Sequence, residues 1–215
     1  MYRIVSLLFS SIILLGCAEN KNSHEILPYY NEADFTPIFI EDKSDIPNVI
    51  THQISNFHCF NQDSTIITQE SIEGKIHVAN FIFTSCGSIC PVMTEHMKIV
   101  SDSLKQNPDV VFLSYSVTPW IDKPFVLQKF KIRNNIQNPN WHFLTGNKAE
   151  IYKLARQSYF AEEDIGFSKD STEFLHTEHF ILIDKTKRIR GIYNGTLKLE
   201  MYQLLEDIQT LMKSN

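Results

Sequence analysis

The stretch IHVANFIFTSCGSICP, residues 76–91, decides the fold. Its first half is a near-continuous apolar run, which is typical of a strand buried on both faces. Its second half carries Cys86 and Cys90, four positions apart, with Pro91 directly after the second cysteine. Proline is favoured in the first turn of a helix, and apolar residues recur at helical spacing from Met93 onward. The stretch therefore predicts a strand, a turn that bears two cysteines, and a helix.

Strand and helix signals alternate through the rest of the chain. The sequence predicts a second buried strand, two helices (the second capped by Asn147), a hairpin with a Lys-rich turn, and a last helix. The segments are residues 110–117, 124–134, a helix after 147, 179–184, 188–195 and 199–212. The order β-α-β-α-α-β-β-α is an α/β layout. With the cysteine turn after the first strand, it predicts a thioredoxin-like three-layer α/β/α sandwich with a central mixed sheet.

The composition of the 215 residues indicates a globular protein, with 43% hydrophobic and 12% aromatic residues. The formal net charge of −5 argues against binding to nucleic acid through phosphate neutralisation. The basic residues form one small group, at Lys185, Lys187, Arg188 and Arg190. We interpret this group as a solvated turn before a strand.

The N-terminus carries one charge, Arg3, and then an apolar run from Ile4 to Leu15. This run suits a signal peptide better than a membrane span. It ends in Leu-Leu-Gly-Cys at residues 14–17, which resembles the lipobox of a bacterial lipoprotein. The resemblance implies lipidation at Cys17 and an extracytoplasmic protein anchored to a bacterial membrane on its periplasmic side. An ordinary signal peptide and an uncleaved anchor are the alternatives.

Three regions follow from this pattern. Residues 1–17 are the expected lipoprotein signal peptide, and residues 18–47 a polar tether with an extended lead-in. Residues 48–215 are the expected thioredoxin-like domain.

The cysteine pair has three possible roles: a disulfide staple, a redox switch or a metal clamp. Outside the cytoplasm paired cysteines usually oxidise, but a bridge across so small a loop removes little chain entropy. The start of a helix favours thiolate over thiol, and a thiolate is both a nucleophile and a soft metal ligand. Two such sulfurs and one imidazole are enough ligands for a three-coordinate Cu(I) site.

A histidine that faces the pair is therefore the residue to find. His176 and His179 lie where the chain approaches the predicted strand at 179–184. In thioredoxin-like folds this position faces the active-site cysteines, and redox members usually carry a cis-proline there. The chain has no proline after Pro139, which favours coordination over general disulfide exchange.

The segment from Cys86 to Pro91 after a buried strand, followed downstream by His176-Thr177 and an apolar strand, resembles the SCO/SenC family. The resemblance covers roughly residues 48–212. Members are membrane-tethered, thioredoxin-fold proteins implicated in copper delivery to the copper A site of cytochrome c oxidase. The resemblance implies a copper site, for Cu(I) and also Cu(II), with Cys86, Cys90 and His176 as ligands. His179 is expected to be a packed or surface histidine.

One position departs from the family pattern. Many members have Ser-Val-Asp-Pro after the second buried strand, whereas residues 116–119 here read Ser-Val-Thr-Pro. Asp122 is expected to keep a second acidic position of that loop. If the missing carboxylate tunes the site or docks a partner, the change to Thr118 alters metal affinity or partner choice.

Two functions remain open from these residues. As a metallochaperone, which is not an enzyme, the protein passes copper to the copper A subunit of the oxidase. As a thiol–disulfide oxidoreductase, it uses Cys86 to attack a client disulfide and Cys90 to resolve it, with a thiol reductant protein as a further partner. A peroxidase is disfavoured because Thr84 is one position out of the T-x-x-C register.

The remaining candidates have structural interpretations. Cys59 is expected to be a buried free cysteine in a strand, with His58 beside it on the surface. His96 is six residues beyond Cys90 and is expected to point elsewhere. Met93 and Met97 are expected in the core.

Overall fold

The computed structural model describes residues 26–161, 175 and 177–214. The predicted lipidation site Cys17 and the predicted ligand His176 lie outside the described residues. No helix within the described part of the chain is long and apolar enough to cross a membrane.

The helices and strands alternate through most of the described chain. The strands are β1 (Tyr29–Tyr30), β2 (Pro37–Ile38), β3 (His58–Asn61), β4 (Ile66–Thr68), β5 (Ile76–Ile82), β6 (Val110–Ser116), β7 (Trp141–Thr145), β8 (His179–Ile183) and β9 (Ile189–Asn194). The helices are α1 (Ile46–Val49), α2 (Ile89–Ser103), α3 (Pro124–Arg133), α4 (Lys148–Lys153) and α5 (Lys198–Lys213), with short 3-10 turns η1 (Lys43–Asp45) and η2 (Glu70–Ile72) and a π-helical turn η3 (Leu154–Ser158).

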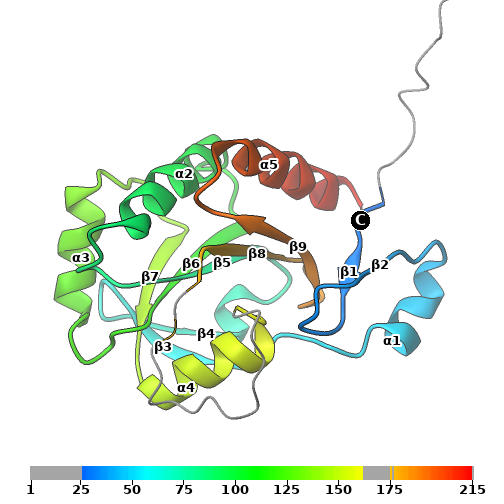
Figure 1. Cartoon of the computed structure of the whole chain (residues 1–215), viewed down its shortest axis with the longest axis horizontal. Helices are drawn as coiled ribbons and strands as arrows, with labels where there is room; N and C mark the ends of the chain where they lie inside the picture. Colours follow the sequence, from blue (N-terminus) through cyan, green and yellow to red (C-terminus); the bar gives the residue numbers. More distant parts are fainter. Residues whose placement is uncertain (1–25, 162–174, 176, 215) are drawn as a thin grey trace, which may run out of the picture.

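These strands form one mixed sheet, with nine strands within the described residues in the order β2-β1-β9-β8-β5-β6-β7-β3-β4. β5, β6 and β7 are parallel neighbours, and β8 runs antiparallel to β5. Figure 1 shows α2 and α5 on one face of the sheet and α4 on the other. The prediction of a thioredoxin-like three-layer α/β/α fold is confirmed.

β5 explains why the opening stretch is so apolar. All seven of its residues are buried, because helices cover both faces of the sheet. Its side chains alternate between two cores. Val78 and Ile82 face the helices α2 and α5, whereas Ala79 and Phe81 face the side of α4 and η3.

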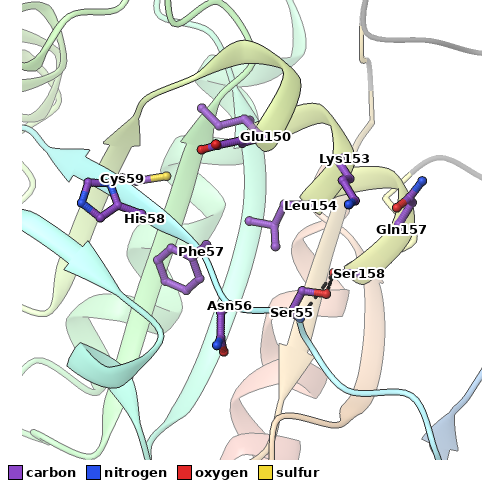
Figure 2. Close-up of a pocket in the computed structure, with 11 residues that line it drawn as sticks. Ser55, Asn56, Phe57, His58, Cys59, Glu150, Lys153, Leu154, Gln157 and Ser158 are labelled. Atoms are coloured by element: carbon purple, nitrogen blue, oxygen red, sulfur yellow. Dashed lines mark hydrogen bonds between the residues drawn. The ribbon is translucent and has the colours of Figure 1, made fainter.

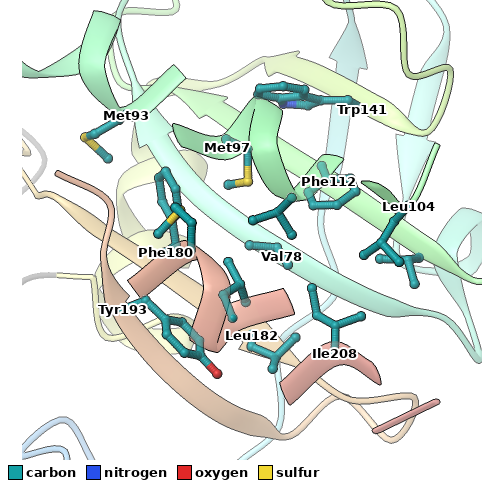
Figure 3. Close-up of a cluster of buried hydrophobic side chains, with 14 of the residues drawn as sticks. Val78, Met93, Met97, Leu104, Phe112, Trp141, Phe180, Leu182, Tyr193 and Ile208 are labelled. Atoms are coloured by element: carbon teal, nitrogen blue, oxygen red, sulfur yellow. The ribbon is translucent and has the colours of Figure 1, made fainter. Parts of the chain in front are cut away.

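The core on the α2 and α5 side holds the methionines that follow the cysteine pair. Met93 and Met97 are fully buried, together with Phe112 of β6, Trp141 of β7 and Phe180 of β8 (Figure 3). The prediction that these methionines belong to the core is confirmed. They hold α2, and with it the turn that carries the cysteines, firmly against the sheet.

The predicted helix after Asn147 is also present. The Asn147 side chain accepts a hydrogen bond from the backbone N–H of Glu150 (3.2 Å), as expected of an N-cap. The helix then continues as the π-helical turn to Ser158.

The predicted element order was incomplete, because it lacked β7 and the edge strands. β7 is five residues long and carries the polar, half-buried His142 in its interior, so it has a weak strand pattern. The lead-in before Asn48 adds two short strands to the sheet, with Tyr30 of β1 paired to Ile189 of β9. The pairing of β1 depends on β9, which is far away in the sequence, so the local sequence pattern does not reveal it.

Candidate functional site

The cysteine pair lies where β5 ends and α2 begins. The chain leaves β5 at Ile82 and turns, with the Cys86 backbone N–H donating to the Phe83 carbonyl (3.2 Å). Ser88 is the N-cap of α2, and Cys90 lies in its first turn. The Thr94 hydroxyl donates to the Cys90 carbonyl (2.7 Å) one turn later. The predicted strand–turn–helix is therefore the observed frame of the site.

The two thiols differ in exposure. Cys86 is half-buried, whereas Cys90 is only 4% exposed and is part of the core under α2. Both are free thiols. The Cys86 Sγ lies 3.9 Å from the Ser88 Oγ. An incoming molecule therefore meets Cys86 first.

The electrostatics of the turn separate the two thiols further. Burial raises the pKa of the Cys86 thiol, but hydrogen bonds from the Cys90 and Ser88 backbone and side chains outweigh it and lower the pKa to about 7. For Cys90, burial dominates and raises the pKa to about 12. At neutral pH a large share of Cys86 is therefore thiolate, whereas Cys90 stays protonated.

The buried carboxylate of Asp122 holds the turn that leads to Cys86. Asp122 is fully buried and accepts hydrogen bonds from the Thr84 backbone N–H (3.1 Å) and the Thr84 hydroxyl (2.5 Å). It also accepts from the hydroxyls of Ser116 (2.6 Å) and Thr118 (2.9 Å). Asp122 therefore joins the end of β6 to the residue two positions before Cys86.

This network accounts for the threonine at position 118. Its hydroxyl donates to Asp122, so the loop holds one buried carboxylate with hydroxyl donors around it. The sequence pattern singled out Asp122 and Thr118 but did not reveal that Thr84 and Ser116 donate hydrogen bonds to Asp122. The available signal was a hydroxyl residue at or just after the end of each of two adjacent parallel strands, with an acid in the loop that follows the second strand.

The approach to β8 lies at the same end of the sheet as the cysteines. β8 is antiparallel to β5, with Ile181 opposite Ala79, so the segment before His179 runs beside the exit of β5. Within that segment, Leu175 and Thr177 are buried, and the Thr177 hydroxyl accepts from the His179 backbone N–H (3.2 Å). His176 lies outside the described residues, and its role as third ligand stays a prediction.

Two of the other histidines lie as expected, since His179 is packed and His58 is exposed. The His179 ring packs edge-on against Phe35, with 5.6 Å between ring centroids. The His96 Nδ1 is hydrogen-bonded to the Gly195 carbonyl (2.8 Å), and His58 is exposed. Within residues 26–161, 175 and 177–214, no three His, Cys, Asp or Glu side chains are arranged to hold a metal. Cys86 and Cys90 supply two soft ligands, which fits copper when a third ligand joins them.

Cys59 lies apart from this site, on β3. It is buried, as expected, and borders a cavity of about 430 Å³ between β3 and the α4–η3 segment (Figure 2). Burial raises the pKa of its thiol to about 12. Cys59 is therefore no part of the candidate centre.

Known proteins are similar to this chain in sequence. The sequence profile of the SCO1/SenC family matches residues 48–213. The SCO1 protein homolog of Bacillus subtilis is 33% identical over 167 residues, which are 77% of this chain and 86% of that protein.

Solved structures agree with the sequence comparison. BsSco, reported with a disulfide switch and as a member of the Sco family of cytochrome c oxidase assembly proteins, is 31% identical. It aligns with a TM-score of 0.64 over 76% of this chain and 95% of that one. Copper-bound ScoI of Bradyrhizobium japonicum, at 22% identity, shares the fold with a TM-score of 0.56 over 72% of this chain and 96% of that one. By its match to the family profile and its identity to the Bacillus subtilis relative, the chain belongs to the SCO1/SenC family.

Proposed function

We propose that the protein is a membrane-anchored metallochaperone that binds copper through Cys86, Cys90 and His176. It delivers the copper to the copper A site of cytochrome c oxidase. One observation carries the proposal: two free thiols lie together at the start of α2, in a family whose solved members include copper-bound proteins. Cu(I) is the form that two thiolates and an imidazole favour.

The asymmetry of the two thiols supports transfer by ligand exchange. Cys86 is exposed enough for an incoming thiolate of the client to reach a metal bound there, whereas Cys90 is anchored in the core. A three-coordinate site leaves room for that incoming ligand. The copper is cargo, so the ligands have to release it as well as hold it.

The location of the protein is part of the proposal. Lipidation of Cys17 anchors the chain outside the cytoplasm, on the periplasmic side of a bacterial membrane. The lipobox-like sequence at residues 14–17 supports this anchor.

A second candidate is a dedicated thiol–disulfide reductase for the copper A cysteines. The observation that favours it is the pairing of an accessible thiol with a buried one four residues on, because such a pair can attack and then resolve a mixed disulfide. The disulfide switch reported for BsSco points the same way. The two roles need different residues, since reduction requires the cysteines alone.

The deciding experiment is a competition titration of the reduced protein with Cu(I). We expect one copper per chain for the native protein, and a Kd at least about tenfold weaker for His176→Ala, because one of three ligands is lost. His179→Ala is the matched control, since it removes an imidazole from the same segment that packs against Phe35. Equal affinity in the native protein and His176→Ala would contradict the three-ligand site and favour the reductase.

A further inference from the structure

A groove lies at the opposite end of the sheet from the cysteine pair. It has a volume of about 640 Å³ and is bordered by the first described residues, the η1–α1 segment, the β8–β9 turn and the end of α5. Ile76, the first residue of β5, lines it, whereas Cys86 follows the last residue of β5. Figure 1 shows the end of α5 beside β1 and β2.

The groove is rich in positive charge. Lys43, Lys185, Arg188 and Lys213 line it, together with the acidic Glu41 and the paired Arg190 and Asp184. Within the described residues the ion pairs are Lys98–Glu95 and Arg190–Asp184, so no described carboxylate pairs with any of these four side chains. A local excess of positive charge on a chain of net charge −5 indicates an anionic partner.

The place where the chain enters the fold is fixed beside this groove. The sequence predicted a solvated turn for the basic group at 185–190, but Arg190 is buried. Its guanidinium pairs with Asp184 (3.2 Å) and stacks on Tyr29 (3.7 Å to the ring centroid). It also donates to the carbonyls of Leu27 (2.7 Å) and Pro28 (2.9 Å). These contacts hold residues 27–29 against the sheet.

The chain length before this point limits how far the groove can lie from a lipid anchor. Residues 18–25 separate Cys17 from Ile26. Fully extended, this connection spans about 30 Å, and as a flexible coil it averages roughly 17 Å. An anchored domain therefore keeps this end within reach of the headgroups.

Exposed apolar side chains lie on the same segments. Ile26, Phe39 and Val49 are 48%, 64% and 45% exposed. Basic and apolar side chains together are what a lipid surface with negative headgroups recognises.

We propose that this groove binds the anionic headgroups of the membrane, through Lys43, Lys185, Arg188 and Lys213. The inference rests on the membrane anchor of the proposed function. Because β5 separates the groove from the cysteines, a domain bound in this way holds Cys86 and Cys90 away from the lipid. The pair then faces the aqueous side, where a client domain can reach it.

Vesicle binding tests the proposal without the anchor. The chain from Ala18 onward keeps every described residue and lacks Cys17, so its binding to vesicles reports the groove alone. We expect it to co-sediment with vesicles of phosphatidylglycerol and phosphatidylcholine, but not with phosphatidylcholine alone. The Lys185→Glu/Lys213→Glu variant should bind at least about tenfold more weakly, since each basic side chain near an anionic surface contributes roughly a factor of five.

The matched control is Lys129→Glu/Lys198→Glu, which changes the net charge equally at exposed positions on α3 and at the start of α5. It should bind like the native chain, and thermal unfolding should show both variants folded. An equal loss of vesicle binding in the two variants would overturn the proposal. Equal binding of the native chain to vesicles with and without phosphatidylglycerol would overturn it as well. The anchor is tested separately, by detergent-phase partitioning of the full chain and of Cys17→Ala.

Discussion

Cys86 and Cys59 are both free thiols beside strands of one sheet, yet their surroundings are opposite. Cys86 follows the carboxyl end of β5, at a helix start, where N–H groups point at its sulfur and its pKa falls to about 7. Cys59 lies within β3, only 3% exposed, where burial and the nearby Glu150 raise its pKa to about 12. A free cysteine therefore becomes a ligand or nucleophile through its position at a helix start and its exposure, and its presence in the chain is not enough.

The largest expected difference between the two regions is in alkylation. At pH 7.5 the reduced native protein should react with iodoacetamide at Cys86 at least about 10³-fold faster than at Cys59, because Cys86 is largely thiolate and accessible. The Cys86 rate should rise with pH and level off above about pH 8, since its pKa is about 7. Mass spectrometry of timed samples measures each site.

The control is the same reaction in guanidinium chloride, where the two thiols should react at similar rates. Comparable alkylation rates at Cys86 and Cys59 in the native protein would contradict this prediction, since neither the helix start nor burial would then govern reactivity.

The next effect concerns the carboxylate that holds the Cys86 turn. Asp122→Ala leaves the buried donors of Thr84, Ser116 and Thr118 without their acceptor. We expect the free energy of unfolding to fall by about 2–4 kcal/mol, as measured by urea denaturation. The Cys86 alkylation rate should change as well, because the turn loses its attachment to β6.

Asp122→Asn is the matched variant, since it keeps the size and one accepting oxygen. Its loss of stability should be smaller. A change in stability with unaltered Cys86 reactivity would show that Asp122 supports the fold without positioning the turn.

The smallest effect is expected at Cys59. Cys59→Ala should cost about 1 kcal/mol through lost packing and leave Cu(I) affinity unchanged, because the thiol lies outside the candidate centre. In the native protein stability should fall as pH rises above about 9, since the unfolded thiol ionises while the folded one, with its pKa of about 12, stays protonated. Cys59→Ala should lack that part of the pH dependence. Weaker copper binding in this variant would place Cys59 in the copper site.

Much of the candidate site could be predicted from the sequence. The strand at residues 76–82, the cysteine turn and the buried Met93 and Met97 follow from local apolar pattern and helix-start chemistry. The hairpin of β8 and β9 was equally predictable, because its strands are adjacent in the chain.

Other features depend on contacts between distant parts of the chain. The Asp122 network joins three segments, and its hydrogen bonds form only when β5 and β6 are paired in register. β1 pairs with β9 across most of the chain length, and Arg190 is buried there instead of solvated. Such pairings have no local signal.

The sequence by itself determined that two soft ligands stand at a strand-to-helix turn, because residue types and spacing decide which chemistry is available. The tertiary structure alone decided which of the two thiols is acidic and accessible and which is buried, and that the basic groove lies at the far end of β5. The physical reason is that acidity, exposure and surface charge depend on distances between groups that only folding brings together.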